Sequence, residues 1–211
     1  MKSIRATCLL STGLLVAGLP AYSQWYVGAS AGESRANSGG SNQAEALLDL
    51  GFDAASTTGD DKDAAYRLHG GYRWNRWVAF ELGYTDLGRY SLSTTVLPAG
   101  RLDNRVKISG FDASVIGMLP LGERFALFGR VGAFAARTRA SFSGSGSVLI
   151  FDGAGESTRR TTSALYGAGL TYDFTQNLGL RAEYTRYRRV GDDQTGQYQP
   201  HTVTAGIQYR F

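Results

Sequence analysis

Apolar and polar residues alternate along the last eleven residues of the chain. Val203, Ala205, Ile207, Tyr209 and Phe211 lie on one face of this segment, and mostly polar residues lie on the other. A strand of about 9–11 residues with one apolar face is long enough to cross a bilayer at a tilt, and a polar second face suits a barrel interior. A half-buried strand of a soluble protein alternates in the same way, so this segment alone leaves both interpretations open.

The same alternation recurs along the chain in segments that are each closed by a turn. The eight predicted strands cover residues 25–35, 64–74, 77–87, 104–118, 125–137, 161–173, 178–188 and 198–211. Short connections at Asn75, Pro120 and Gln176 alternate with long ones at 34–63, 88–103, 138–160 and 189–197. Membrane barrels have brief periplasmic turns and extended outer loops. The pattern therefore predicts an all-β fold, an eight-stranded antiparallel up-and-down transmembrane β-barrel with four long extracellular loops.

The N-terminus has the pattern of a secretory signal peptide. Two basic residues precede an apolar stretch over residues 8–19, which is too short to span a bilayer as a helix. We expect cleavage before Gln24, so that residues 1–23 are a signal peptide and residues 24–211 form the mature barrel. Cys8 is the single cysteine of the chain and leaves with the signal. Disulfides, thiol catalysis and cysteine-based metal sites are then excluded from the mature chain.

Net charge and the distribution of apolar residues argue against two classes of protein. The chain has 22 basic and 18 acidic side chains, and loss of Lys2 and Arg5 with the signal leaves it nearly neutral. The basic isoelectric point is therefore no indication of nucleic-acid binding. No long apolar segment other than the signal occurs, which excludes a helical membrane protein.

Charged residues on the inward face separate a membrane barrel from a soluble one. A secreted lipocalin-like barrel, the soluble alternative, is apolar inside. The predicted lumen instead holds seven charged residues: Glu81, Asp112, Arg130, Asp173, Arg181, Glu183 and Arg210. An eight-stranded barrel is only wide enough for side chains to fill, and buried charges must be paired. We predict a lumen ion-pair network that contains Glu81, Arg130, Arg181, Glu183 and Asp112.

Several short motifs in a fixed order resemble the OmpA-type family of eight-stranded outer-membrane barrels. Residues 25–28 read WYVG, 80–84 FELGY, 87–89 LGR, 181–184 RAEY and 209–211 YRF. The resemblance covers essentially the whole mature chain and implies a bacterial outer-membrane location. It also implies that Glu81 and Arg181 pair across the lumen.

The resemblance has limits at two places. The family's second, lysine-bearing lumen pair is missing, because Ser114 and Thr171 occupy those positions, and this leaves a small water path or gate open as an interpretation. Larger relatives add a peptidoglycan-binding domain, whereas this sequence ends on its last strand, so we expect a stand-alone barrel. Tyr209 and Phe211 resemble the terminal signal that the barrel-assembly machinery recognises.

Basic residues cluster at the predicted outer ends of the strands, where the outer leaflet is lipopolysaccharide. Arginine suits the phosphates of this lipid because it binds them through two hydrogen bonds. The alternative is ordinary solvated loop charge. The cluster consists of Arg89, Arg101, Arg105 and Lys107, together with the seven residues for which we hypothesise lipopolysaccharide binding, Arg137, Arg139, Arg159, Arg160, Arg186, Arg188 and Arg189.

These features predict a monomeric outer-membrane protein with a structural, envelope-integrity and adhesion-like surface role. Its expected partners are outer-membrane lipid, lipopolysaccharide and a host or surface ligand bound through the loops, without nucleic acid, metal or cofactor. The first alternative is a narrow gated porin-like channel for small solutes. A lipid-A-modifying enzyme is the third interpretation, but only His69 and His201 could serve as a histidine base and neither has a serine two residues on. We therefore expect no enzyme activity.

Overall fold

The computed structural model describes residues 24–36, 53–97, 100–146, 156–188, 190 and 199–211. Nine strands occur in this part of the chain: β1 (Trp25–Arg35), β2 (Asp53–Asp60), β3 (Lys62–Arg73), β4 (Val78–Leu97), β5 (Gly100–Leu121), β6 (Phe125–Gly146), β7 (Glu156–Asp173), β8 (Leu178–Tyr187) and β9 (His201–Arg210). No helix of these residues is long and apolar enough to cross a membrane.

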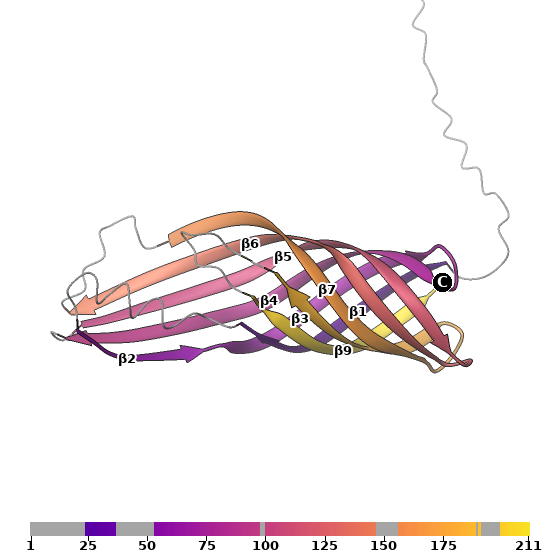
Figure 1. Cartoon of the computed structure of the whole chain (residues 1–211), viewed down its shortest axis with the longest axis horizontal. Coiled ribbons are helices and arrows are strands. Elements are labelled where there is room, and N and C mark those ends of the chain that lie inside the picture. Colours follow the sequence, from indigo (N-terminus) through magenta and orange to yellow (C-terminus); the bar gives the residue numbers. More distant parts are fainter. Residues whose placement is uncertain (1–23, 37–52, 98–99, 147–155, 189, 191–198) are drawn as a thin grey trace, which may run out of the picture.

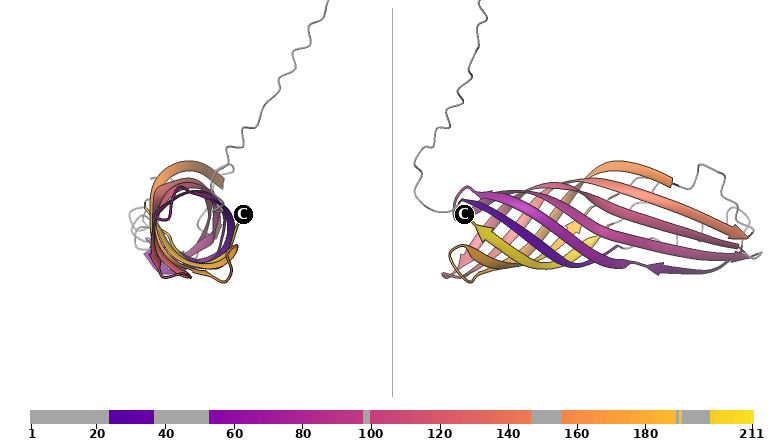
Figure 2. Two further views of the ribbon diagram at one scale, coloured as in Figure 1. Left: turned by 90° about the vertical axis from the view of Figure 1, so that its right-hand side faces the viewer. Right: turned by 180° about the vertical axis from the view of Figure 1, so that it is seen from behind.

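Eight of the strands close into an antiparallel barrel, as the alternation predicts. Neighbours pair in the order β1, β3, β4, β5, β6, β7, β8 and β9, and β9 returns to β1 (Figures 1 and 2). The closing seam joins the first and last strands from Tyr26 opposite Arg210 to Arg35 opposite His201. Closure satisfies the backbone groups that an open sheet edge would expose to hydrocarbon.

The short turns at one end of the barrel are shaped by local hydrogen bonds. Oδ1 of Asn75 accepts from the backbone N–H groups of Trp77 and Val78 at 2.7 and 2.8 Å. Oγ1 of Thr175 accepts in the same way from Asn177 and Leu178. Such side-chain bonds to the following backbone favour tight turns. Short turns lie on the periplasmic side of outer-membrane barrels, so we call the opposite end of this barrel the outer end.

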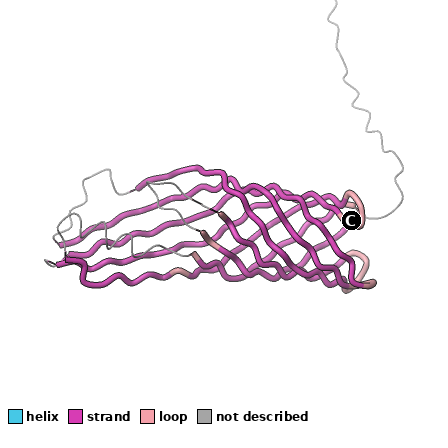
Figure 3. Tube along the Cα trace, viewed as in Figure 1, coloured by secondary structure: helices cyan, strands magenta, loops and turns pink. Residues whose placement is uncertain are grey.

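Four strands extend well beyond β8 and β9 at the outer end: β4, β5 and β6 reach furthest, and β7, with 18 residues, pairs with β6 as far as Ser141. β4, β5 and β6 have 20, 22 and 22 residues, whereas β8 and β9 have 10 each (Figure 3). β2 pairs with the outer part of β4 and widens this wall. In the predicted loops at 88–103 and 138–160, the residues that the structure describes are therefore strand. Sequence alternation missed them because both faces of a strand are polar once it leaves the membrane, as the Ser and Thr residues of β4 show.

Outside, the strands present a continuous apolar belt. Leu68 and Leu82 are 63 % and 70 % exposed, and the burial pattern of β8 alternates along its whole length. Aromatic side chains border the belt at both ends. Those near the short turns are Tyr72, Trp74, Trp77, Tyr172 and Phe174, and those nearer the outer end are Tyr84, Tyr166 and Tyr184. Aromatic girdles of this kind mark the two membrane interfaces.

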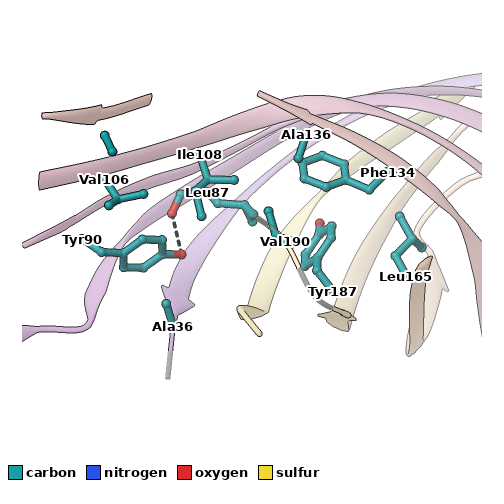
Figure 4. Close-up of a cluster of buried hydrophobic side chains, with 11 residues drawn as sticks. Ala36, Leu87, Tyr90, Val106, Ile108, Phe134, Ala136, Leu165, Tyr187 and Val190 are labelled. Atoms are coloured by element: carbon teal, nitrogen blue, oxygen red, sulfur yellow. Dashed lines mark hydrogen bonds between the residues drawn. The ribbon is translucent and has the colours of Figure 1, made fainter. Parts of the chain in front are cut away.

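Inside, apolar and ionic layers succeed one another along the barrel axis. Tyr26, Ala79, Ile116 and Phe128 form a buried cluster near the short turns. Charged residues follow at mid-depth. A larger apolar cluster closes the outer part of the lumen (Figure 4) and consists of Ala36, Leu87, Tyr90, Val106, Ile108, Phe134, Ala136, Ala140, Leu165, Tyr187 and Val190. The sequence analysis anticipated the ionic layer and not the apolar layers.

Candidate functional site: the lumen ring and the outer basic collar

Six charged side chains from five strands meet at mid-depth in the lumen. Each of them is at most 6 % exposed. They alternate in sign around a closed circuit, which we call the lumen ring, in the order Arg67, Asp112, Arg130, Glu183, Arg181 and Glu81. Three guanidinium groups face three carboxylates, so the ring is formally neutral.

One half of the ring is held by Arg67 of β3. Its Nη2 lies 3.1 Å from Oε2 of Glu81 and 3.0 Å from Oδ1 of Asp112. The hydroxyl of Tyr26 donates to Oε1 of Glu81 at 2.9 Å, and that of Thr85 donates to Oδ2 of Asp112 at 3.2 Å. Both carboxylates therefore receive neutral donors in addition to arginine, which satisfies their remaining acceptor sites.

The other half joins Arg130 of β6 to the two charged residues of β8. Nη1 of Arg130 donates to Oε1 of Glu183 at 2.6 Å, and its Nε donates to Oγ of Ser114 at 2.9 Å. Nη2 of Arg181 lies 2.8 Å from Oε2 of Glu183, and its guanidinium stacks on the ring of Phe128. Further ion pairs from Arg130 to Asp112 and from Arg181 to Glu81 complete the circuit.

The structure brings all five predicted lumen residues into this ring and adds Arg67. The alternation had placed Arg67 on the inward face of its strand, but its depth relative to the other charges depends on strand register, which the sequence does not show. Asp173 and Arg210 pair with each other nearer the short turns and take no part in the ring. Ser114, at a position where the family carries a charged pair, serves as an acceptor for Arg130.

His69 lies beside the ring, packed edge-on against Tyr26. Neither of its ring nitrogens, nor Nη1 of Arg67, has a hydrogen-bond partner within the described residues. The other histidine, His201, contacts the ring of Tyr184 at a centroid distance of 5.8 Å. Among the residues that the structure describes, no three His, Cys, Asp or Glu side chains gather as metal ligands do.

A second feature surrounds the outer end of the belt. Each of the eight barrel strands carries a basic side chain or a histidine at this level, and we call these residues the outer basic collar. They are Arg35, Lys62, Arg89, Lys107, Arg137, Arg139, Arg160, Arg186, Arg188 and His201. Acidic residues at this level include Glu33, which pairs with Arg35, and Asp86, which lies 3.1 Å from Nζ of Lys107.

The predicted lipopolysaccharide residues divide between two faces. Arg137 stands directly opposite Arg160 on the outward face, and Arg139, Arg186 and Arg188 also point outward. Arg159 is opposite Thr138, whose side chain is buried, so it lies on the other face of β7. Its side chain is exposed, so lipopolysaccharide binding by Arg159 stays a prediction, although the alternation of side chains along a strand puts it on the face opposite to Arg160. Arg189 lies outside the described residues.

Sequence comparison agrees with the barrel fold. The family described as the OmpA-like transmembrane domain matches residues 20–211. The chain belongs to this family. OmpA-like barrels are outer-membrane proteins, and this chain is a bacterial outer-membrane barrel. It is similar to outer membrane protein A of Shigella flexneri, with 24 % identity over 98 % of this chain and 54 % of that protein. Outer membrane protein P5 of Haemophilus influenzae is 26 % identical, over 98 % of this chain and 60 % of that protein.

The chain thus spans about half the length of the curated OmpA-type relatives that it matches. Solved structures show the same fold. Neisserial surface protein A superposes with a TM-score of 0.56 at 19 % identity, covering 89 % of this chain and 97 % of that one. OprG of Pseudomonas aeruginosa gives 0.54 at 11 % identity, covering 90 % and 97 %. At these identities the likeness concerns the fold alone.

Proposed function

We propose that this barrel is a closed structural protein of the outer membrane with an adhesion-like surface role. The observation that supports it is the lumen ring, a neutral circuit of six buried charges between two apolar layers. A solute crossing this lumen would have to break ion pairs in a region of low dielectric, which is costly. The extended wall of β4, β5 and β6 supplies surface for contacts outside the cell.

Planar-bilayer recording of the purified mature chain tests the closed lumen. The wild type is expected to stay silent, and the double substitution E81A/R181A, which empties part of the ring, is expected to show discrete openings. Steady openings of the wild type would reject the closed barrel. They would favour the alternative, a narrow gated channel. The supporting observation for it is that buried nitrogens of His69 and Arg67 have no partner within the described residues, since bound water usually satisfies such groups.

The outer basic collar supports lipopolysaccharide as a partner. Arg137 and Arg160 face each other across β6 and β7, and within the described residues neither is in an ion pair. Like charges directly opposite destabilise a sheet, and lipid phosphates would relieve this repulsion. The double substitution R137E/R160E is expected to reduce co-purified lipopolysaccharide, whereas R76E in a periplasmic turn is not. If R137E/R160E and R76E co-purify with equal amounts of lipopolysaccharide, the collar is removed from the proposal.

The proposed role is non-catalytic and monomeric. Neither histidine has the hydrogen-bonded nucleophile that acyl hydrolysis requires, within the described residues. Incubation with lipid A followed by mass analysis is expected to show no change in its acyl chains. Deacylated or acyl-transferred product that disappears with H69A or H201A would instead support the lipid-modifying enzyme.

A further inference from the structure

Two arginines face the lumen at the end of the barrel that carries the short turns, which we call the short-turn mouth. Arg73 is the last residue of β3, and Arg210 is the last residue of β9 (Figure 1). β1 lies between these strands: Tyr26 stands opposite Arg210, and the backbone N–H of Arg73 donates to the C=O of Gln24 at 2.7 Å. One strand therefore separates the two arginines, a backbone spacing of about 10 Å, which two arginine side chains can bridge.

The carboxylate at this level is committed to one of the two arginines. Asp173 of β7 is the one acid among the lumen-facing side chains that the structure describes in the short-turn mouth. It pairs with Arg210 across β8, where Gly179 lies between them. A Cβ added at Gly179 would come within 2.7 Å of Oδ1 of Asp173, so the glycine lets the carboxylate reach across the strand. Within the described residues, Arg73 is in no ion pair.

Arg73 also lacks a hydrogen-bond acceptor. Its Nε is buried and has no partner within the described residues. The side chains beside it on neighbouring strands do not supply one, because Ala79 has no acceptor and Oε1 of Gln24 already accepts from the hydroxyl of Tyr72. Buried donors are almost always satisfied by protein, water or a bound ion. A guanidinium without a carboxylate, next to a second arginine, favours an acceptor that carries negative charge.

The short-turn mouth is open to water, whereas the layer beneath it is not. The side chains of Arg210 and Asp173 are 12 % and 24 % exposed. Tyr26 and Phe128, which belong to the apolar cluster beneath them, are 4 % and 5 % exposed. A small ligand can therefore reach the arginines from the periplasm and is stopped by the apolar cluster. Partial exclusion of water at such a position strengthens charge-assisted hydrogen bonds relative to those on an open surface.

We propose that the short-turn mouth binds the carboxylate of a periplasmic molecule between Arg73 and Arg210. Arg73 holds the carboxylate side-on through Nε and a terminal nitrogen, a two-bond geometry that lysine does not offer. Arg210 shares its charge between this ligand and Asp173. Two cations and one acid carry a single net positive charge, so a monovalent carboxylate matches them better than a doubly ionised phosphate. The site lies at the opposite end of the barrel from the outer basic collar and depends on neither the collar nor the lumen ring.

Solution NMR of the refolded mature chain in detergent micelles, with isotope-labelled arginine, tests the site through the Nε–H signals of Arg73 and Arg210. The probes are sodium acetate and sodium phosphate, with sodium chloride at the same ionic strength as the reference. Acetate is expected to shift the Arg73 signal saturably, and chloride should bind at least about tenfold more weakly because it cannot accept two parallel hydrogen bonds. Equal shifts with all three salts, or shifts that never saturate, would show charge screening and overturn the site. Tighter binding of phosphate than of acetate would overturn the assignment to a carboxylate.

Substitutions at Arg73 locate the anion, with the Arg210 signal as the reporter. R73M is expected to weaken acetate binding at least about tenfold, the loss of a charge-assisted hydrogen bond. R73K keeps the charge but not the two-bond geometry, and it should also weaken binding. R76M is the matched control, because Arg76 is exposed in the neighbouring turn and stacks on Trp77 at 4.9 Å from the ring centroid; its affinity should equal that of the wild type. Heat-modified gel mobility verifies that each variant is folded.

A substitution at Asp173 should act in the opposite direction. D173N removes the acid that competes for Arg210, so acetate binding, read from the Arg73 signal, should become about tenfold tighter. Wild-type affinity in R73M or in R73K would overturn the contact with Arg73. Unchanged or weaker binding in D173N would overturn the part assigned to Arg210.

Discussion

Substitutions at Glu81 and Arg181 test whether the lumen ring is an electrostatic network or a set of side chains that merely fill space. Their side chains are 0 % and 4 % exposed, respectively, and Nη2 of Arg181 lies 3.3 Å from Oε2 of Glu81 in addition to the closer Nη1 contact. The perturbations are E81Q, R181M and the double variant. Each single change leaves the ring with one unbalanced charge, whereas the double change restores neutrality.

The expected loss follows from the contacts that remain. Removing one partner of a buried ion pair costs about 3–5 kcal/mol. In R181M, Glu81 keeps Arg67 at 3.1 Å and the hydroxyl of Tyr26 at 2.9 Å. In E81Q, Arg181 keeps Glu183. We therefore expect each single variant to lose about 3 kcal/mol, the lower end of that range. The double variant should lose about 4 kcal/mol rather than the sum of the two, because directly coupled residues are not additive.

These losses are measured by urea unfolding of the mature chain in phospholipid vesicles, followed by tryptophan fluorescence. Equal slopes of unfolding free energy against urea concentration confirm that the same transition is compared. R160M is the control, because Arg160 is an exposed arginine on the outward face of β7 and its removal should cost less than about 0.5 kcal/mol. Additive losses in the double variant would show that the two charges do not interact in the folded state. Losses below about 1 kcal/mol in the single variants would show a hydrated, screened lumen.

Three further changes test other parts of the fold. In the same assay, G88A is expected to lower the free energy of unfolding by about 2 kcal/mol and G122A by about 1 kcal/mol. Both glycines have positive φ, but only the Cβ added at position 88 would meet Asp63, at 2.7 Å. Equal losses in the two variants would contradict this reasoning. F134A opens a cavity in the outer apolar cluster and should cost about 3–5 kcal/mol, and a loss under about 1 kcal/mol would mean that the cluster is loosely packed. Deletion of Phe211 removes one backbone hydrogen bond, to Trp25, so the refolded protein should be almost as stable as wild type. In cells, the amount of folded, heat-modifiable barrel should fall sharply. Normal assembly in cells would reject Phe211 as the terminal signal.

Several features of this barrel follow from the sequence alone. Which face of a strand a residue occupies is a local property, since side chains alternate with a period of two. The eight barrel strands, the outward position of Leu68 and Leu82, and the inward position of Glu81 and Arg181 could all be predicted for this reason. The same alternation puts Arg159 and Arg160 on opposite faces of β7, although both were grouped with the outer basic residues by their position along the chain.

Other features depend on how the strands are staggered around the closed barrel. Depth in the lumen is set by register, so only the folded chain shows that Arg67 completes the ring while Asp173 and Arg210 pair elsewhere. The lengths of β4, β5 and β6 depend on mutual backbone pairing, which needs no apolar pattern once the strands leave the membrane. A period of two assigns faces within one strand, whereas contacts between strands arise only when the sheet closes. For that reason the sequence determined what points inward, and the tertiary structure decided which of those groups meet.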